Sequence, residues 1–251
     1  MEDARSFFMQ AEKYYLGYGV KKSYDLAFKR YYVGFLKCPN SLQTAAKLGL
    51  PEAASMLGNV FENGQGCAKD LSSAITWYKS AAAQNYAEAY NHLGRLHELG
   101  KGCKVDLVAA FEYYKKGAEL GHLDALTNYG NMLQLGRGCA MDLSLAVEQF
   151  TIASNKDYAR AQNALGNCYY LGKGVETDCH LAVQWFKKAA DQGYPSAYNN
   201  LGICCEEGNG VARDLVSAKS YYSQAADANH PNGTNNLAYM FLMEVCLFGL
   251  A

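Results

Sequence analysis

The chain has 251 residues, half of them hydrophobic, and its 23 Lys and Arg against 24 Asp and Glu leave a formal net charge of −1. This near balance of interspersed charges excludes the basic footprint of a nucleic-acid-binding protein. The first residues lack the basic and then apolar pattern of a secretory signal, and no stretch reaches the roughly 20 apolar residues of a membrane-spanning helix, so we expect a cytoplasmic or nuclear protein without membrane insertion.

Residues 1–50 contain a weakened copy of a pattern that recurs along the rest of the chain, with Gly17-Tyr18-Gly19 followed by Tyr31-Tyr32. Extra residues around 36–44 separate this copy from the next one. Because proline breaks a helix interior, Pro39 predicts a helix, a short break near residues 38–40 and a second helical piece through Ala45-Ala46. We interpret residues 1–50 as a degenerate N-terminal cap repeat.

Residues 51–230 consist of five complete copies of a 36-residue unit, at 51–86, 87–122, 123–158, 159–194 and 195–230. Each copy has a glycine at the end of a Leu-Gly or Tyr-Gly pair, then two glycines separated by one residue, then an aspartate. The first glycine recurs as Gly58, Gly94, Gly130, Gly166 and Gly202. A period of this length with fixed small residues is typical of stacked helical hairpins. The sequence therefore predicts an all-α solenoid.

The second copy shows the physical role of each recurring residue. Its first helix, helix A, is predicted over residues 88–99, where apolar residues three or four apart share one face. Gly100 ends this helix because glycine adopts the left-handed conformation of a helix C-cap. Asp106 is an N-cap for the second helix, helix B, over residues 107–118. We expect the Leu-Gly glycine to allow close approach of the two helices, and Tyr114 to fill space between units.

The recurring letters A-x-x-x-L-G, G-x-G-[VC], D, A-x-x-[WY]-[YF] and A-A-x-x-G resemble the pattern of the Sel1-like repeat family, which is related to the tetratricopeptide repeats. The five copies match at most of these positions, with Tyr129, Gln149 and Ser154 as mild departures. The resemblance implies an all-α, right-handed α/α superhelix of helix-turn-helix repeats. It also implies a role in assembling protein complexes, with the A helices lining the concave surface.

Residues 231–251 begin a further helix A, which we interpret as a C-terminal capping helix or as the start of another repeat. Ala238 stands where the Leu-Gly glycine is expected, and no paired glycines follow. The tail over residues 239–248 is too apolar for a solvent-exposed cap. It is expected to pack back on the last unit, to bind a partner, or to continue into a further domain.

The nine cysteines are interpreted as reduced, structural residues. Cys67, Cys103 and Cys139 follow the paired glycines, where other copies have valine, so we expect a buried apolar slot. Cys168 and Cys204 likewise share one core-facing column. Equivalent positions in successive units should lie at least ~8–10 Å apart, whereas a disulfide requires α-carbons closer than about 7 Å. The odd number of cysteines points the same way.

No residue pattern indicates a catalytic site, a metal site or a cofactor. His92 and His97 are five residues apart, off a common helical face, and the chain has neither C-x-x-C nor H-E-x-x-H. We interpret these histidines, and the neighbours Cys179 and His180, as surface or rim residues. The glycine loops lack the full phosphate-binding signature and a preceding strand, and helix capping explains their glycines.

The candidate binding surface is the concave groove lined by the A helices, where asparagine recurs. A side-chain amide offers one acceptor and two donors, so a ladder of amides is suited to hold the backbone of an extended peptide. Arg95 would add a charged contact and Tyr170 a flat apolar one; the alternative is that these polar residues are only solvated. The candidate residues are Asn59, Asn91, Arg95, Glu98, Asn128, Asn131, Gln134, Asn163, Asn167, Tyr170 and Asn199.

These observations predict a non-catalytic adaptor or scaffold that binds a partner peptide or helix along the groove. A rigid, pre-organised groove lowers the entropic cost of binding. The alternative is a structural homo-oligomer assembled through the apolar C-terminal helix, and a hydrolase is the least favoured interpretation. The expected partner is another protein, presented as an extended peptide or a helical segment, with no nucleic acid and no cofactor.

Overall fold

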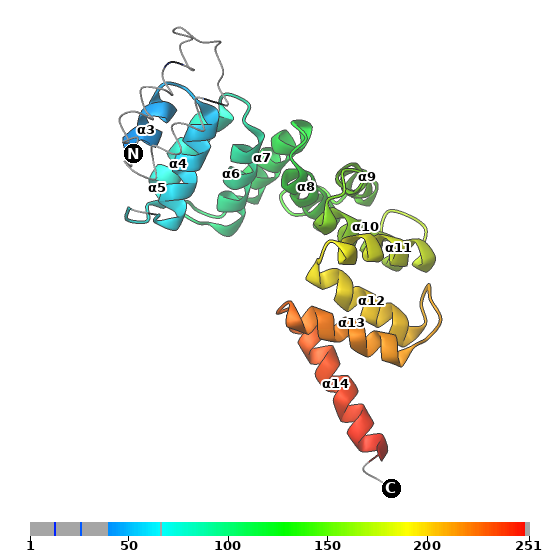
Figure 1. Cartoon of the computed structure of the whole chain (residues 1–251). Helices are drawn as coiled ribbons and strands as arrows, with labels where there is room; N and C mark the ends of the chain where they lie inside the picture. Colours follow the sequence, from blue (N-terminus) through cyan, green and yellow to red (C-terminus); the bar gives the residue numbers. More distant parts are fainter. Residues whose placement is uncertain (1–12, 14–25, 27–39, 66, 249–251) are drawn as a thin grey trace. The chain divides into compact units, whose positions relative to one another are not determined.

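The structure is a computed structural model that describes residues 13, 26, 40–65 and 67–248, with side chains from residue 42 to residue 243 within the last two ranges (Figure 1). This part of the chain contains twelve helices and no strand. The helices are α3 (Asn40–Lys47), α4 (Pro51–Asn63), α5 (Leu71–Ala82), α6 (Ala87–Leu99), α7 (Leu107–Glu119), α8 (Leu123–Leu135), α9 (Leu143–Ser154), α10 (Ala159–Leu171), α11 (Cys179–Asp191), α12 (Pro195–Glu207), α13 (Leu215–Asp227) and α14 (Pro231–Phe248).

The chain divides into two compact units, residues 1–125 and 126–251. The helical piece expected through Ala45-Ala46 is α3. The rest of the predicted N-terminal cap repeat, including the break at Pro39, lies outside the described residues apart from Lys13 and Leu26.

Helices of type A (α4, α6, α8, α10, α12 and α14) alternate with helices of type B (α5, α7, α9, α11 and α13). In the N-terminal unit α4 packs against α5, and α6 packs against α7. In the C-terminal unit α10 packs against α11, and α12 packs against α13. Within each unit, B helices also contact the A helix that follows them: α5 contacts α6 in the N-terminal unit, and α9, α11 and α13 contact α10, α12 and α14 in the C-terminal unit (Figure 1). The stacked helical hairpins confirm the predicted all-α solenoid class.

Residues at both ends of the hairpin connections cap the helices. Oδ1 of Asp106 accepts a hydrogen bond of 2.9 Å from the amide of Ala109 and so caps the N-terminus of α7. The same cap is made by Asp70, Asp142, Asp178 and Asp214. At the other end, Gly100 follows α6 in the left-handed conformation, with φ of 64°. These caps confirm the predicted helix ends. The ends were predictable because both capping interactions are local.

The Leu-Gly glycine lies against an aromatic ring of helix B in its own hairpin. A Cβ atom at Gly94 would come within 2.6 Å of the Tyr114 ring, which is too close for any side chain. The equivalent pairs are Gly58 with Tyr78, Gly130 with Phe150, Gly166 with Phe186 and Gly202 with Tyr222. Tyr78 also stacks on His92 of the following hairpin, with ring centroids 4.6 Å apart. The aromatic column therefore fills space within hairpins as well as between them.

In two of the repeats, the second glycine of the loop pair makes a contact that sequence analysis did not predict. A Cβ atom at Gly174 would lie 2.3 Å from the carbonyl oxygen of Leu143, and one at Gly210 would lie 2.1 Å from that of Cys179. Leu143 and Cys179 are the first residues of the B helices in the preceding repeats. The loop of one repeat therefore touches the start of the previous helix B, and only a residue without a side chain permits this approach.

The cysteines whose side chains are described are all free thiols: Cys67, Cys103, Cys139, Cys168, Cys179, Cys204 and Cys205. Burial raises the pKa of the Cys168 thiol to about 11 and that of the Cys204 thiol to about 12, as suits inert core residues. The slot after the paired glycines is less buried than predicted, because Cys103 is half-buried and Cys67 is exposed. Sγ of Cys103 lies 3.7 Å from the carbonyl oxygen of Leu96, to which the thiol is a weak donor.

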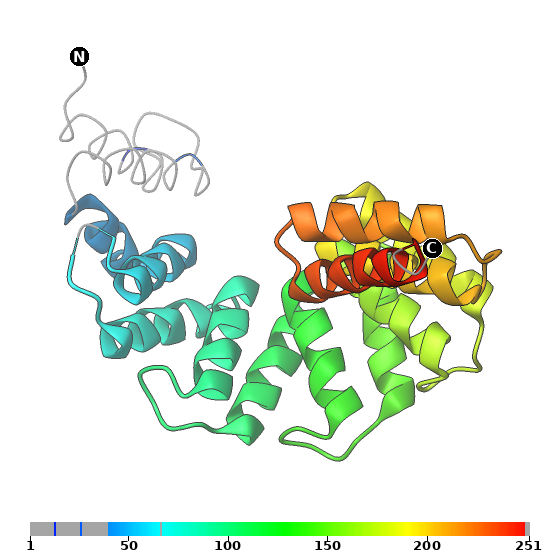
Figure 2. The same cartoon turned by 90° about the horizontal axis from the view of Figure 1, so that it is seen from below.

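The last helix, α14, packs back on α13, as one of the sequence-based alternatives stated (Figure 2). Met240 is buried in this contact, whereas Tyr239, Leu242 and Met243 are exposed. Over the described residues, no helix has both the length and the apolar character needed to cross a bilayer.

Candidate partner-binding face of the A helices

The side chains predicted to contact a partner all lie on A helices, and we call the surface that they form in each unit the A-helix face of that unit. In the N-terminal unit it comprises Asn59, Asn91, Arg95 and Glu98. In the C-terminal unit it comprises Asn128, Asn131, Gln134, Asn163, Asn167, Tyr170 and Asn199. Most of these residues take part in hydrogen bonds inside the protein, and the bonds differ between the two units.

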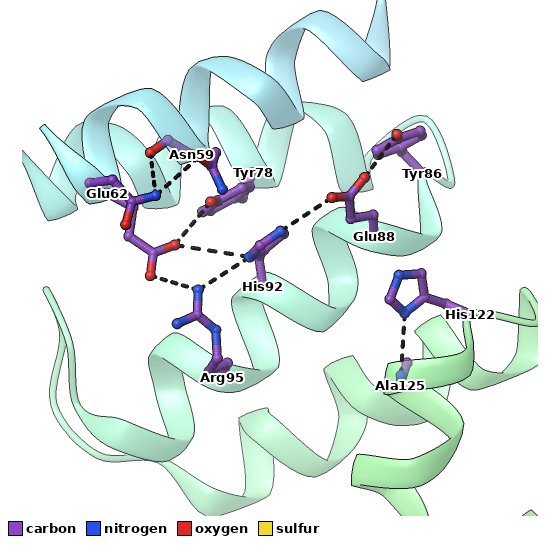
Figure 3. A network of polar contacts seen from close by, with 10 residues as sticks. Asn59, Glu62, Tyr78, Tyr86, Glu88, His92, Arg95, His122 and Ala125 are labelled. Atoms are coloured by element: carbon purple, nitrogen blue, oxygen red, sulfur yellow. Dashed lines mark hydrogen bonds and ion pairs between the residues drawn. The ribbon is translucent and has the colours of Figure 1, made fainter. Parts of the chain in front are cut away.

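In the N-terminal unit the buried carboxylate of Glu62, near the end of α4, organises this face (Figure 3). Its Oε2 accepts a hydrogen bond of 2.9 Å from the Tyr78 hydroxyl, and its Oε1 lies 2.6 Å from Nη2 of Arg95. A buried charge is tolerated only when it is paired and hydrogen-bonded, and Glu62 is only 5 % exposed. Arg95 is thereby anchored, while 37 % of its side chain stays exposed.

His92 extends this network along α6 to a second carboxylate (Figure 3). Its Nδ1 lies 3.3 Å from Nη2 of Arg95, and its Nε2 lies 3.5 Å from Oε1 of Glu88. Glu88 also accepts a hydrogen bond of 3.0 Å from the Tyr86 hydroxyl. The hydrogen bond from His92 is the main cause that holds the pKa of Glu88 below its ordinary value. The chain of contacts therefore keeps Glu88 ionised and joins α4 to α6.

Two of the other predicted residues in this unit have partners close to them. Oδ1 of Asn59 accepts a hydrogen bond of 3.0 Å from Nδ2 of Asn63, one helical turn later. Oε2 of Glu98 accepts one of 2.8 Å from the hydroxyl of Tyr114. Glu98 therefore has a structural partner inside its own hairpin, as Glu62 has in the hairpin before it.

In the C-terminal unit asparagines join neighbouring A helices. Nδ2 of Asn200 on α12 donates to Oδ1 of Asn163 at 2.9 Å and to Oδ1 of Asn167 at 3.1 Å, both on α10. One repeat later, Nδ2 of Asn236 on α14 donates to Oδ1 of Asn199 at 3.0 Å. Asn163 and Asn199 are only 7 % and 4 % exposed. These two amides therefore lie between A helices and hold adjacent repeats together.

Two further residues of the predicted set contact the next repeat. The hydroxyl of Tyr170 donates to the carboxylate of Glu207 and accepts a hydrogen bond of 3.0 Å from Nδ2 of Asn209. Burial, reinforced by Glu207, raises the pKa of Tyr170 to about 12. Nε2 of Gln134 lies 3.5 Å from Sγ of Cys168 on α10. Tyr170 and Gln134 are both half-buried.

At one position of the repeat, the amide nitrogens donate no hydrogen bond to a described residue. Asn131 makes no hydrogen bond to any described residue, and Asn167 uses only its Oδ1, which Asn200 holds. Both side chains are half-buried, and they occupy equivalent positions 36 residues apart. Nearby, Nη2 of Arg160 donates to Oδ1 of Asn128 at 2.7 Å. The A-helix face of this unit thus combines amides used internally with amides that retain free donors.

Sequence reasoning missed Glu62, Asn200 and Asn236 as members of these networks, although one signal was present. The helix-B aromatic residue is tyrosine where helix A carries a glutamate sixteen residues earlier, and phenylalanine where it carries Gln134 or Tyr170. The tyrosine pairs are Glu62 with Tyr78, Glu98 with Tyr114 and Glu206 with Tyr222. A buried tyrosine hydroxyl needs a hydrogen-bond acceptor, and a phenyl ring does not. Comparing the helix-A position with the helix-B position sixteen residues later would therefore have predicted the glutamate–tyrosine pairs.

The interpretation of His97 as a surface or rim residue is wrong. Both ring nitrogens are buried without a hydrogen-bond partner, and the ring lies 5.3 Å from that of Tyr113. Burial is the main cause that lowers the pKa of His97 below its ordinary value. His92 is likewise part of an internal network, whereas His180 is exposed as predicted. Among the described side chains, no three His, Cys, Asp or Glu groups are placed as ligands of a metal ion would be.

Comparison with known families finds the Sel1 repeat, which matches residues 11–29, 51–86, 87–122, 123–158, 159–194 and 195–230. Among curated proteins, none matches the chain. The matched segments include the helical hairpins from α4 to α13 and part of the N-terminal region.

Solved structures resemble the chain along most of its length. A Sel1 repeat protein from Oxalobacter formigenes is 32 % identical, with a TM-score of 0.70 over 90 % of this chain and 88 % of that one. A protective antigen of uropathogenic Escherichia coli with an SLR fold is 26 % identical, with a TM-score of 0.72 over 97 % of this chain, which spans 50 % of that one. An immunity protein from Pseudomonas aeruginosa, 21 % identical with a TM-score of 0.52 over 92 % of this chain and 83 % of that one, shares the fold.

Proposed function

The chain belongs to the Sel1 repeat family, and we propose that it is a non-catalytic adaptor that binds an extended segment of another protein along its A-helix face. Sel1 repeat proteins in general mediate protein–protein interactions and are repeat scaffolds rather than enzymes. The proposal assigns this general activity to particular residues of the present chain.

The observation that carries the proposal is the pair Asn131 and Asn167. The two residues occupy equivalent positions in consecutive repeats, and the Nδ2 of each makes no hydrogen bond to a described residue. Asn200 holds Oδ1 of Asn167, so this amide is oriented before a partner arrives. A side chain that is already ordered loses less conformational entropy on binding. Asn167 therefore supplies a donor to a ligand at low entropic cost, and Asn131 offers the equivalent donor one repeat earlier.

The spacing of the repeats suits an extended backbone. Packed helices lie roughly 8–10 Å apart, and an extended chain rises about 3.3 Å per residue. Amides on consecutive A helices would therefore meet about every third residue of a bound segment. Because a side-chain amide donates to a carbonyl and accepts from an N–H group, this contact does not depend on the ligand's side chains.

In the N-terminal unit, Arg95 would supply a charged contact to such a segment. Its guanidinium is anchored by Glu62 at 2.6 Å and remains partly exposed. Charge-assisted hydrogen bonds from arginine favour carboxylates, so we expect an acidic side chain or a C-terminal carboxylate there. The free thiols of Cys168 and Cys204 support a reducing compartment, the cytoplasm or the nucleus, as the location of this activity.

The test uses peptides selected from a random display library against the full chain. Binding of the selected peptides is then measured by calorimetry with the parent and with the Asn131→Ala/Asn167→Ala variant. Loss of two hydrogen bonds worth about 1 kcal/mol each predicts an affinity at least roughly tenfold lower. The matched control is Asn155→Ala/Gln224→Ala, which removes two exposed side-chain amides from B helices, one at the C-terminal end of α9 and one on α13. Unchanged affinity of the first variant would contradict the proposal.

A further inference from the structure

One side of α14 resembles the helix-B-contacting side of earlier A helices, but no helix B covers it among the residues that the structure describes. We call it the helix-B side of α14; it consists of Leu237, Ala238, Phe241 and Leu242. By the 36-residue period these positions correspond to Leu201, Gly202, Cys205 and Glu206 of α12. Cys205 is 8 % exposed, whereas the equivalent Phe241 is 48 % exposed, and Leu201 is buried, whereas the equivalent Leu237 is half-buried. An apolar side that earlier repeats bury is therefore open on α14.

The residues on the helix-B side of α14 limit which side chains of an occupant are able to pack against it. In the five complete hairpins a Cβ atom at the helix-A glycine would lie 2.4–2.7 Å from an aromatic ring of helix B. Ala238 carries such a Cβ atom, so an aromatic ring cannot pack against it as closely as the Tyr222 ring packs against Gly202. Leu242 also replaces Glu206, which accepts the Tyr222 hydroxyl. The occupant must therefore present an aliphatic side chain here.

The neighbouring surface of α13 is also altered. A cleft of about 600 Å³ between α13 and α14 is lined in part by Leu215, Val216 and Phe241. Nζ of Lys219 lies 4.1 Å from the centroid of the Phe241 ring. At the position of Lys219, α5, α9 and α11 bury an apolar residue, such as Val183, which is 3 % exposed. The Lys219 ammonium lies over the Phe241 ring, and the neighbouring apolar surface stays open, with Val216 82 % exposed.

We propose that the helix-B side of α14 pairs with the same side of α14 in a second copy of the chain. A two-fold axis that crosses the helix makes the two copies antiparallel, and the same residues then serve both subunits. Ala238 and Leu242 are one helical turn apart, so each Leu242 packs on the partner's Ala238. This contact places an aliphatic side chain opposite the small residue, as the helix-B side requires.

The residues of the open surface support a second copy as its occupant. Contiguous exposed apolar patches on soluble proteins mark interaction sites, and Tyr239, Leu242 and Met243 extend the patch along α14. The patch is self-complementary, because it offers both the aliphatic knob and the small residue that receives it. The dimer uses a different surface from the A-helix face and does not rest on the proposed function.

The first test measures the mass of the full chain by sedimentation equilibrium between roughly 1 and 100 μM. The parent is expected to approach twice its chain mass of 27.5 kDa. Leu242→Glu should remain monomeric because a charge would be buried against the partner's Ala238. The control is Val108→Glu on α7, since Val108 is 61 % exposed and Leu242 is 64 % exposed. A monomeric parent, or a dimeric Leu242→Glu variant, would overturn the proposal.

A second test checks the residue pairing itself. Ala238→Lys and Leu242→Glu are each expected to be monomeric when measured alone. In an equimolar mixture the introduced lysine and glutamate face each other on one side of the two-fold axis, and the native leucine–alanine contact forms on the other. The mixture should therefore dimerise, and circular dichroism of each variant checks that its helices are intact. A mixture that stays monomeric overturns the Leu242–Ala238 pairing.

Discussion

The hydroxyl of Tyr222 donates a hydrogen bond of 2.6 Å to Oε2 of Glu206, sixteen residues earlier in the chain. The ring of the same tyrosine covers Gly202 on helix A. The Tyr222 side chain thus joins helix B to helix A of the same hairpin by packing and also by a hydrogen bond. Because Tyr222 is completely buried, its hydroxyl depends on Glu206 as acceptor. The hairpins with tyrosine are therefore more sensitive to loss of the acceptor than those with phenylalanine.

Replacing Glu206 with leucine is expected to lower the free energy of unfolding by about 1–3 kcal/mol, because the buried Tyr222 hydroxyl loses its acceptor. Adding Tyr222→Phe should recover part of the loss, since no hydroxyl is then left unsatisfied. Urea unfolding of the two single variants and the double variant measures this coupling. Strictly additive effects would show that the two side chains do not depend on each other.

Gly174→Ala is expected to destabilise the chain more than Gly193→Ala. Both glycines have φ of 77°, so both substitutions strain the backbone similarly. A Cβ at Gly174 would collide with the carbonyl of Leu143, whereas one at Gly193 meets nothing within 4 Å. The collision should cost roughly 1–3 kcal/mol beyond the shared strain. Equal unfolding midpoints in urea would argue against a tight contact between the loop and the preceding helix B.

Asn200→Ala and Asn131→Ala should separate structural amides from binding amides. Asn200→Ala removes the donor to the buried Asn163, and an unsatisfied buried group costs about 1–3 kcal/mol. Asn131 has no partner among the described residues, so Asn131→Ala should change the free energy of unfolding by less than about 0.5 kcal/mol. Thermal unfolding compares the two variants with the parent. The assignment fails if Asn131→Ala is the more destabilising change.

The stability of the chain is expected to fall with pH below about 6.5 in part because of His97. Burial lowers its pKa from the ordinary value of 6.5, so the unfolded chain takes up a proton in a pH range where the folded chain does not. The contribution is fully present above pH 6.5 and is lost as pH falls through the folded pKa. His97→Phe, which copies Phe61 at the same repeat position, should flatten the profile of unfolding temperature between pH 8 and pH 5. Parallel profiles for variant and parent would exclude His97 as a contributor.

Local interactions explain which parts of the fold were predictable. The cap at Asp106 acts on the amide three residues later, and the left-handed Gly100 acts on the helix turn just before it. Such residues are recognisable in any copy of the repeat, and the period locates the rest. The repeat also showed which face of helix A was polar. It did not show that Gly174 touches the preceding repeat, because that contact depends on how the repeats stack.

The amino-acid sequence by itself determined the helical hairpins, their ends and the repeat family, since the responsible interactions lie within one 36-residue unit. Only the tertiary structure decided which polar residues of the A helices bond inside the protein. Asn163 and Asn200 are 37 positions apart, and their 2.9 Å hydrogen bond forms only when two repeats pack at one particular spacing. Composition and period are the same whether such an amide faces a neighbouring helix or solvent. The distance between neighbouring A helices, which only the tertiary structure gives, decides whether the amide reaches a partner inside the protein or remains in contact with solvent.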